Sequence, residues 1–289
     1  MKSNLPTDDT AARAYWTQKM EEALAFQETM RTYPLQDCGE PLVSLRQAAE
    51  GLDVEFSTTL INECHPRVFF CREGLIASFQ AVARAMNDRG WTLKVEDGYR
   101  SPTMQRAQSH NPRHFDLVLQ KAMWELGGEV PDAAFLLRRM SAVIATRCRV
   151  GTHVSGSAID VSVLDRTTRR EFPRGGRGPT YVEISERTPM DSPFVTAEER
   201  ENREKITTLF QEHGWKEYPW EFWHYSQGDC YAEFLTQSGK PSRYGPVDFD
   251  GTTATPLDPV EADRLLEPVE FYEKQMTAAL ERLAAAKSV

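Results

Sequence analysis

The sequence has little of what marks a secreted, a membrane-spanning or a nucleic-acid-binding protein. Its 289 residues hold five cysteines, an odd number without a CxxC pair, so we expect neither a disulfide framework nor a cysteine zinc site. No apolar run approaches the roughly eighteen residues that a membrane-spanning helix needs. The net charge of −9 argues against the concentrated basic face that binds nucleic-acid phosphates. These absences direct attention to small-molecule chemistry.

The remaining composition is that of an ordinary globular protein, with 40% hydrophobic and 27% charged residues. The N-terminal stretch MKSNLPTDD reaches an acidic pair before any apolar run, which is the reverse of a signal peptide. We therefore expect a cytoplasmic protein.

Segments of helical and of strand periodicity alternate unevenly along the chain. The first sixty residues begin with a helical pattern and are too few to bury a core of their own. We therefore expect residues 1–60 to form a helical extension packed on a domain of residues 61–245, followed by a helical tail over residues 246–289. Further patterns predict helices over 8–33, 73–87, 115–126, 132–148, 196–213 and from 258 onward, and strands over 91–95, 158–163 and 215–225.

These strands are too few and too unevenly spaced for a repeated βαβ array. The prediction is an α+β fold in which helices pack around an antiparallel sheet, and the 158–163 strand should bury one face. A polar stretch around His110 and His114 is predicted to be a solvated turn. The apolar stripe from Leu265 to Leu283 could cover a pocket mouth or form a homodimer interface.

Two short segments combine imidazoles with carboxylates. One begins at His153 and ends at Asp160, and the other runs from Glu221 to His224. A hydrolytic zinc site needs three protein ligands, an open position for water and a nearby base. These four residues can fill those roles.

The spacing within each segment demands an irregular backbone. His153 and Asp160 would lie about 23 Å apart in an extended strand, so the chain must fold back, and Gly156 permits the necessary turn. Glu221 and His224 would face opposite sides of a regular strand and meet only across a bulge or tight turn. Pro219, just upstream, favours such an irregularity.

Four motifs, spread in order over about residues 75 to 230, carry a resemblance to a known family. The motifs are Asp97-Gly98-Tyr99-Arg100, His153-x-x-Gly156-Ser157-Ala158-Ile159-Asp160, Ser185-Glu186-Arg187-Thr188 and Glu221-x-Trp223-His224-Tyr225. With them the chain resembles the zinc D-alanyl-D-alanine dipeptidases of the vancomycin-resistance type, within the wider D,D-peptidase and hedgehog-like group.

The resemblance implies a role for each residue. His153, Asp160 and His224 should bind one zinc ion per chain, with Glu221 as general base and Arg100 stabilising the tetrahedral oxyanion. The chemistry agrees, because two neutral imidazoles and one carboxylate leave the metal one net positive charge. The implied substrate is a small peptide such as D-Ala-D-Ala.

The segment that should bind the substrate's ammonium departs from the family pattern. It carries an insertion over residues 174–180, and Val182 or a neighbour takes the place of the family's acidic residue, for which Glu183 could substitute. Gly151 and Thr152 replace a serine pair. Candidate substrate contacts are Thr152, Ser157 and Glu183, and Tyr99 and Trp223 could contact the substrate or support the ligands.

Two other functions remain open. One is a D,D-carboxypeptidase or endopeptidase acting on peptidoglycan fragments, which would ordinarily require export. The other is a zinc-binding interaction module without catalysis. Glu221 and Arg100 argue against the module, because a structural zinc requires neither.

Overall fold

A five-stranded sheet lies at the centre of the computed structural model, which describes residues 9–176 and 184–286. The strand order is β2-β4-β5-β7-β6. The last four strands pair antiparallel, as predicted, whereas β2 joins β4 in parallel at one edge and makes the sheet mixed. The strands are β2 (Val54–Phe56), β4 (Trp91–Asp97), β5 (Ala158–Asp165), β6 (Lys216–Tyr218) and β7 (Glu221–Ser226).

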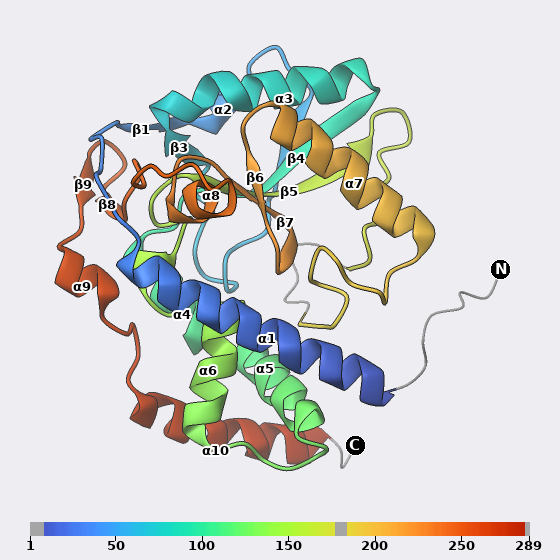
Figure 1. Ribbon diagram of the computed structural model, residues 1–289, viewed down its shortest axis with the longest axis vertical. Coiled ribbons are helices and arrows are strands. Elements are labelled where there is room, and N and C mark those ends of the chain that lie inside the picture. Colours follow the sequence, from blue (N-terminus) through green and yellow to red (C-terminus); the bar gives the residue numbers. More distant parts are fainter. Residues whose placement is uncertain (1–8, 177–183, 287–289) are drawn as a thin grey trace.

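Two helices, α3 (Ile76–Asp88) and α7 (Ala197–Glu212), cover one face of the sheet (Figure 1). Alternate side chains of β4 and β5, such as Val95 and Val161, point into the main hydrophobic core beneath these helices. Nearly every residue of β5 is buried, so the prediction of a single buried face is wrong. The reason is that β5 is the central strand and protein packs on both of its faces.

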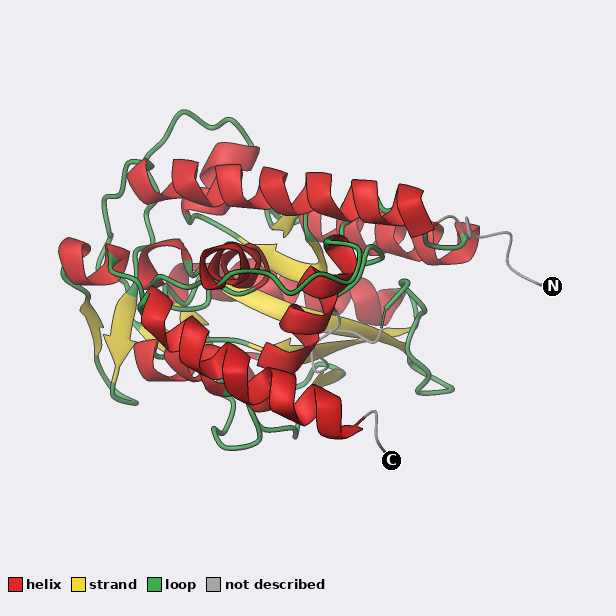
Figure 2. Ribbon diagram, turned by 90° about the horizontal axis from the view of Figure 1, so that it is seen from below, coloured by secondary structure: helices red, strands yellow, loops and turns green. Residues whose placement is uncertain are grey.

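Helices from the first half of the chain cover the opposite face. These are α1 (Asp9–Thr32), α4 (Pro102–His110), α5 (Pro112–Glu125) and α6 (Ala133–Val143). Figure 2 shows the strands enclosed between layers of helix.

Helix α1 bridges two parts of this layer. Trp16, Met20 and Ala23 pack against α6, whereas Phe26 and Met30 pack against residues of β6 and of α8 (Cys230–Leu235). The predicted extension is thus integral to the fold, and it also contributes β2 to the central sheet.

Helix caps explain several element boundaries. Thr196 and Glu199 form the reciprocal capping box that begins α7. The polar stretch around His110 and His114 is not a solvated turn, since His110 ends α4 and His114 lies in the first turn of α5. Asn111 caps α5 by accepting hydrogen bonds from the backbone N–H groups of residues 113 and 114.

The C-terminal helix predicted from residue 258 is in fact two helices, α9 (Pro259–Asp263) and α10 (Val269–Ala286). Pro268 separates them, because a proline disfavours helical conformation in the residue before it. The apolar face of α10 packs on α5 and α6 within the same chain. The stripe that could have formed a dimer interface is therefore used internally.

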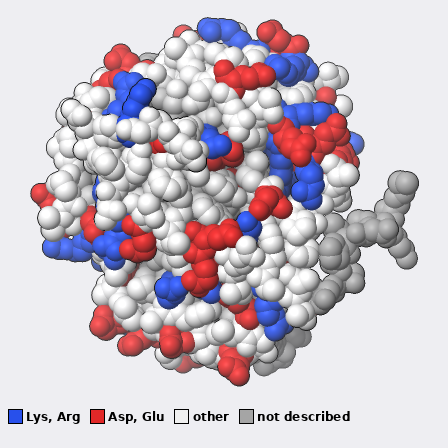
Figure 3. Space-filling view, in the orientation of Figure 1, with Lys and Arg blue, Asp and Glu red and all other residues white. Residues whose placement is uncertain are grey.

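The remaining elements are short. They are β1 (Leu42–Ser44), α2 (Leu45–Ala48), β3 (Phe70–Arg72), the 3-10 turns η1 (Glu73–Leu75) and η2 (Cys148–Val150), β8 (Val247–Phe249) and β9 (Ala254–Pro256). Among the described residues, no helix has the length and apolar character needed to cross a bilayer. Acidic and basic side chains are interspersed over the molecular face shown in Figure 3.

Candidate metal centre

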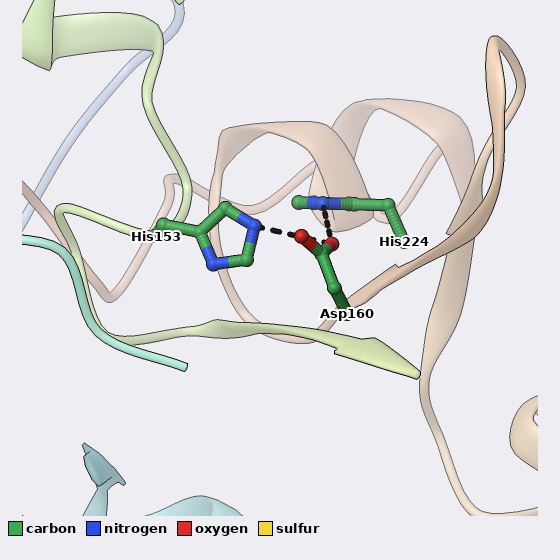
Figure 4. A group of neighbouring side chains, drawn as sticks. All are labelled: His153, Asp160 and His224. Carbon is green, nitrogen blue, oxygen red and sulfur yellow. Dashed lines mark hydrogen bonds and ion pairs between the residues drawn. The ribbon is translucent and has the colours of Figure 1, made fainter. Parts of the chain in front are cut away.

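Three side chains from two separate segments of the chain converge on one point (Figure 4). They lie on the face of the sheet opposite α3 and α7, because the neighbours of Asp160 in β5, Ile159 and Val161, point into the core beneath these helices. His153 Nε2 lies 3.2 Å and His224 Nδ1 lies 3.0 Å from the same atom, Asp160 Oδ1. All three residues are buried, and their ligand atoms lie within 4.8 Å of one another. Ligands around a tetrahedral zinc, with bonds of about 2.0–2.1 Å, are about 3.3 Å apart. Both the donor set and its spacing therefore fit zinc.

The turn before β5 brings His153 to Asp160. Gly156 has a φ of +68°, a left-handed conformation that glycine adopts without strain, and the chain reverses there as predicted. A Cβ atom at this position would also overlap Leu42 Cδ2. Asp160 and His224 are direct partners across the antiparallel β5–β7 ladder, which places their side chains on one face.

A bulge in β7 brings the second carboxylate to the cluster. Glu217 pairs with Tyr225, but the next residue of β6, Tyr218, pairs with Glu221, so three residues of β7 oppose no residue of β6. Phe222 points toward α7, where Arg203 lies 4.5 Å from the centre of its ring. Glu221 instead faces the cluster, with Oε2 3.9 Å from His224 Nδ1. The irregularity predicted from the sequence is present.

Hydrogen bonds fix the orientation of both imidazoles. His153 Nδ1 lies 2.7 Å from the carbonyl oxygen of Gly98. Because a carbonyl oxygen only accepts, Nδ1 carries the proton and Nε2 presents its lone pair to the cluster. His224 Nε2 lies 2.9 Å from Thr152 Oγ1, which leaves Nδ1 as the ligand atom. Such contacts orient the ligands of metal sites.

The two oxygens of Asp160 have different partners. Oδ1 meets the imidazoles, whereas Oδ2 accepts a hydrogen bond of 3.1 Å from Arg100 Nη2. Arg100 Nε also donates to Asp97 Oδ2 at 2.7 Å, so two carboxylates hold the guanidinium in place. Burial opposes ionisation of Asp160, but the imidazoles hold its pKa well below the usual range.

Glu221 has the opposite titration behaviour. Burial raises its pKa to about 7, with His224 opposing and Asp160 reinforcing this rise. A carboxylate with a pKa near neutrality can both accept and return a proton, as a general base must.

A cavity of about 170 Å³ opens in front of the ligands. Arg100, Thr152, Glu221 and Trp223 contribute to its wall. This volume exceeds the space that a single water occupies by about tenfold and can admit a small peptide.

Two other predicted substrate contacts, Ser157 and Tyr99, do not reach this wall. Ser157 donates to Asp229 Oδ2 at 2.6 Å, and Tyr99 donates to the carbonyl of Val247 at 3.0 Å. Both are buried beside the site, where they support the turn and the strand end, and neither lines the cavity formed by the described residues. Glu183, like Val182, lies outside the described residues.

A family model described as D-ala-D-ala dipeptidase matches residues 73–238. The chain belongs to the D-ala-D-ala dipeptidase family. The match contains His153, Asp160 and His224, which could hold a metal ion, together with Arg100 and Glu221. The family consists of zinc-dependent peptidases, and the donor set of this chain is consistent with that metal.

One solved structure, that of the LdcB LD-carboxypeptidase, is similar over 74% of this chain and 78% of its own, at 18% identity and a TM-score of 0.36. Among curated proteins none matches the chain.

Two residues that line the cavity were not anticipated from the sequence. Arg67 lines the cavity, and its Nη1 lies 3.1 Å from Asp97 Oδ2. His114 also lines it, and burial, followed by the charge of Arg100, lowers the pKa of His114 to about 4. No local motif marks Arg67, because its partner is distant in sequence. For His114, the Asn-Pro pair at 111–112 is a helix-start signal that indicates an ordered position.

Proposed function

We propose that this protein is a zinc-dependent peptidase that hydrolyses the peptide bond of a dipeptide, D-Ala-D-Ala or a related small peptide or amide containing D-amino acids. The observation that carries the proposal is the position of Glu221, a partly buried carboxylate beside His224 at the edge of the cavity. A purely structural zinc site has no use for such a base.

His153, Asp160 and His224 would hold the zinc ion. When bound, zinc supplies a Lewis acid for the scissile carbonyl and lowers the pKa of a water molecule to about 7. Glu221 accepts the proton of that water and returns it to the nitrogen of the leaving amine. The bond formed is between the water oxygen and the carbonyl carbon, and the bond broken is the peptide C–N bond.

Arg100 would stabilise the negative charge that develops on the carbonyl oxygen. Its guanidinium lines the cavity and is held by Asp97 and Asp160, so little reorganisation is needed during the reaction. Burial opposes the charge of Arg100, but these two carboxylates raise its pKa and keep it a cation.

The cavity favours a short substrate. Helix α1 crosses the helical layer beside the site and contributes Trp16 and Met20 to the cavity wall. A long peptidoglycan strand would have to pass this helix, which supports a dipeptide over a carboxypeptidase or endopeptidase substrate.

The test is hydrolysis of D,D-, L,D- and L,L-dipeptides with free or blocked amino termini by the zinc-loaded protein. Glu221→Gln should retain about one zinc per chain yet lose on the order of 10²–10⁴-fold in kcat. Glu217→Gln is the matched control, because Glu217 lies in the neighbouring strand and does not line the cavity of the described residues. Full activity of Glu221→Gln, or hydrolysis of no dipeptide by the wild type, would overturn the proposal.

A further inference from the structure

The cavity extends beyond the part of the chain that matches the family. The match begins at residue 73. Several wall residues precede it, from α1 and from the segment before β3. They are Trp16, Met20, Gln27, Leu60, Ile61, Asn62 and Arg67. The part of the wall they form lies outside the segment that matches the family.

Two of these residues, Trp16 and Met20, form an apolar part of the wall together with residues inside the family match. We define the apolar wall as Trp16 and Met20 of α1, Ala142 and Val143 of α6, and Trp220, which all line the cavity and pack in one hydrophobic cluster. Trp16 and Met20 are each only 2% exposed, so they are held by packing. A wall fixed in this way is already formed before any ligand arrives.

The apolar wall begins close to the metal ligands. The ring of Tyr218 is centred 5.6 Å from that of His224, and the ring of Trp220 is centred 5.2 Å from that of Tyr218. Trp220 also directly precedes the base Glu221 in sequence. In a bound peptide substrate, the two residues on either side of the scissile bond lie near the metal ligands. The side chain of either one is therefore within reach of the apolar wall.

Unpaired polar atoms border the same cavity. Trp16 Nε1, the amide nitrogen and oxygen of Asn62, and His114 Nδ1 are buried and have no hydrogen-bond partner among the described residues. Buried polar groups normally find a partner. These donors and acceptors match the N–H and C=O groups of a peptide, which a pure hydrocarbon would lack.

We propose that the preferred substrate carries a large apolar side chain, aromatic or branched aliphatic, next to the scissile bond, and that the apolar wall receives it. This inference rests on the proposed peptidase function and narrows its substrate class. The methyl group of alanine would leave most of the wall without a contact. A larger apolar side chain removes both its own surface and that of the wall from water, which favours binding in the transition state.

The experiment compares kcat/KM for D-Ala-D-Ala, D-Phe-D-Ala and D-Ala-D-Phe on the zinc-loaded protein. We expect at least one phenylalanine peptide to exceed D-Ala-D-Ala by roughly 10- to 200-fold, the usual range for an apolar subsite. Val143→Phe, which fills the cavity from the apolar wall, should lower kcat/KM for the phenylalanine peptides far more than kcat/KM for D-Ala-D-Ala.

A second pair of variants guards against misfolding. Met20→Ala removes part of the wall and should reduce the preference for the phenylalanine peptide. Met30→Ala is the matched control, because Met30 is an equally buried methionine of α1 that lies outside the cavity wall, and this variant should retain the preference.

Measuring the binding of ligands that are not hydrolysed tests the apolar wall independently of the proposed peptidase activity. Acetohydroxamate and phenylacetohydroxamate share a metal-binding group and differ in the apolar group, so the ratio of their Kd values, measured by calorimetry, reports on the wall without hydrolysis. If no peptide is hydrolysed, the proposed function fails, and tighter binding of phenylacetohydroxamate by at least about tenfold still supports the wall. Equal Kd values in that case, or a preference for D-Ala-D-Ala in hydrolysis, would overturn the inference.

Discussion

Replacing Thr152 by valine should weaken zinc binding, although Thr152 is not itself a ligand. Its Oγ1 lies 2.9 Å from His224 Nε2, and each of the two residues is only 4% exposed. Valine has nearly the same shape and lacks the oxygen, so the buried N–H of His224 would lose its partner. Water cannot easily replace the hydroxyl at such burial.

The expected magnitude follows from that lost hydrogen bond. A buried donor left unpaired costs about 1–3 kcal/mol, or roughly 5- to 150-fold in a binding constant. Loss of a contact that orients a ligand typically weakens metal binding by about 10- to 100-fold. We therefore expect the Kd for zinc to rise on the order of tenfold to a hundredfold.

Competition with a chromophoric chelator measures this Kd, and circular dichroism verifies folding. Thr152→Ser keeps the hydroxyl and should bind zinc nearly as tightly as the wild type. If folded Thr152→Val binds zinc within about twofold of the wild type, the orienting role is refuted. An increase in KM at unchanged zinc affinity would instead make Thr152 the substrate contact that the sequence suggested.

Two further predictions concern stability. Burial raises the pKa of Glu221 from 4.5 to about 7, so its contribution to stability is present at acidic pH and is lost as the pH rises through that range. The melting temperature of the chelator-treated protein should thus fall more steeply between about pH 4.5 and pH 7 than that of Glu221→Gln, and parallel curves would contradict this. Gly156→Ala should lower the melting temperature more than Gly39→Ala. Both glycines have a positive φ, and an alanine in this conformation costs about 1–2 kcal/mol of stability at either position. Only at Gly156 would the new Cβ atom also overlap a neighbouring side chain, that of Leu42. Similar losses in the two variants would show that the overlap is relieved without cost.

The parts of the site that the sequence predicted are those with a local cause. Gly156 permits a left-handed turn, and the three-residue spacing of Glu221 and His224 demands a bulge if both are to face one site. The capping box at Thr196 depends on residues within one helical turn. In each case the interacting groups are close in sequence, so the pattern alone carries the information.

The parts that the sequence did not predict depend on contacts between distant elements. Arg67 reaches the site through Asp97, and helix α1 reaches the cavity through α6. The direction of Ser157 and Tyr99, away from the cavity, is set by their hydrogen bonds to residues far along the chain. None of these contacts leaves a periodic or spaced signal.

The central strand β5 shows a related limit. Its alternating residues predicted one buried face, and the structure buries both. Serine and aspartate at alternate positions suggested an exposed face, but Asp160 is buried with His153 and His224 in the cluster that could hold a metal. From the sequence alone, a polar residue that serves a buried site cannot be distinguished from a polar residue that faces the solvent.

The bulge in β7 makes the chemistry more fragile than the fold. Tyr225 lies in the main core below α7, while the ladder resumes at Glu221 on the far side of the inserted residues. Deleting Phe222 or Trp223 would leave strand pairing on both sides able to form, yet Glu221 and His224 could no longer face the same point. A protein with this sheet intact and this insertion altered would keep the architecture and lose the reaction, so an insertion or deletion here tells more about activity than overall structural similarity does.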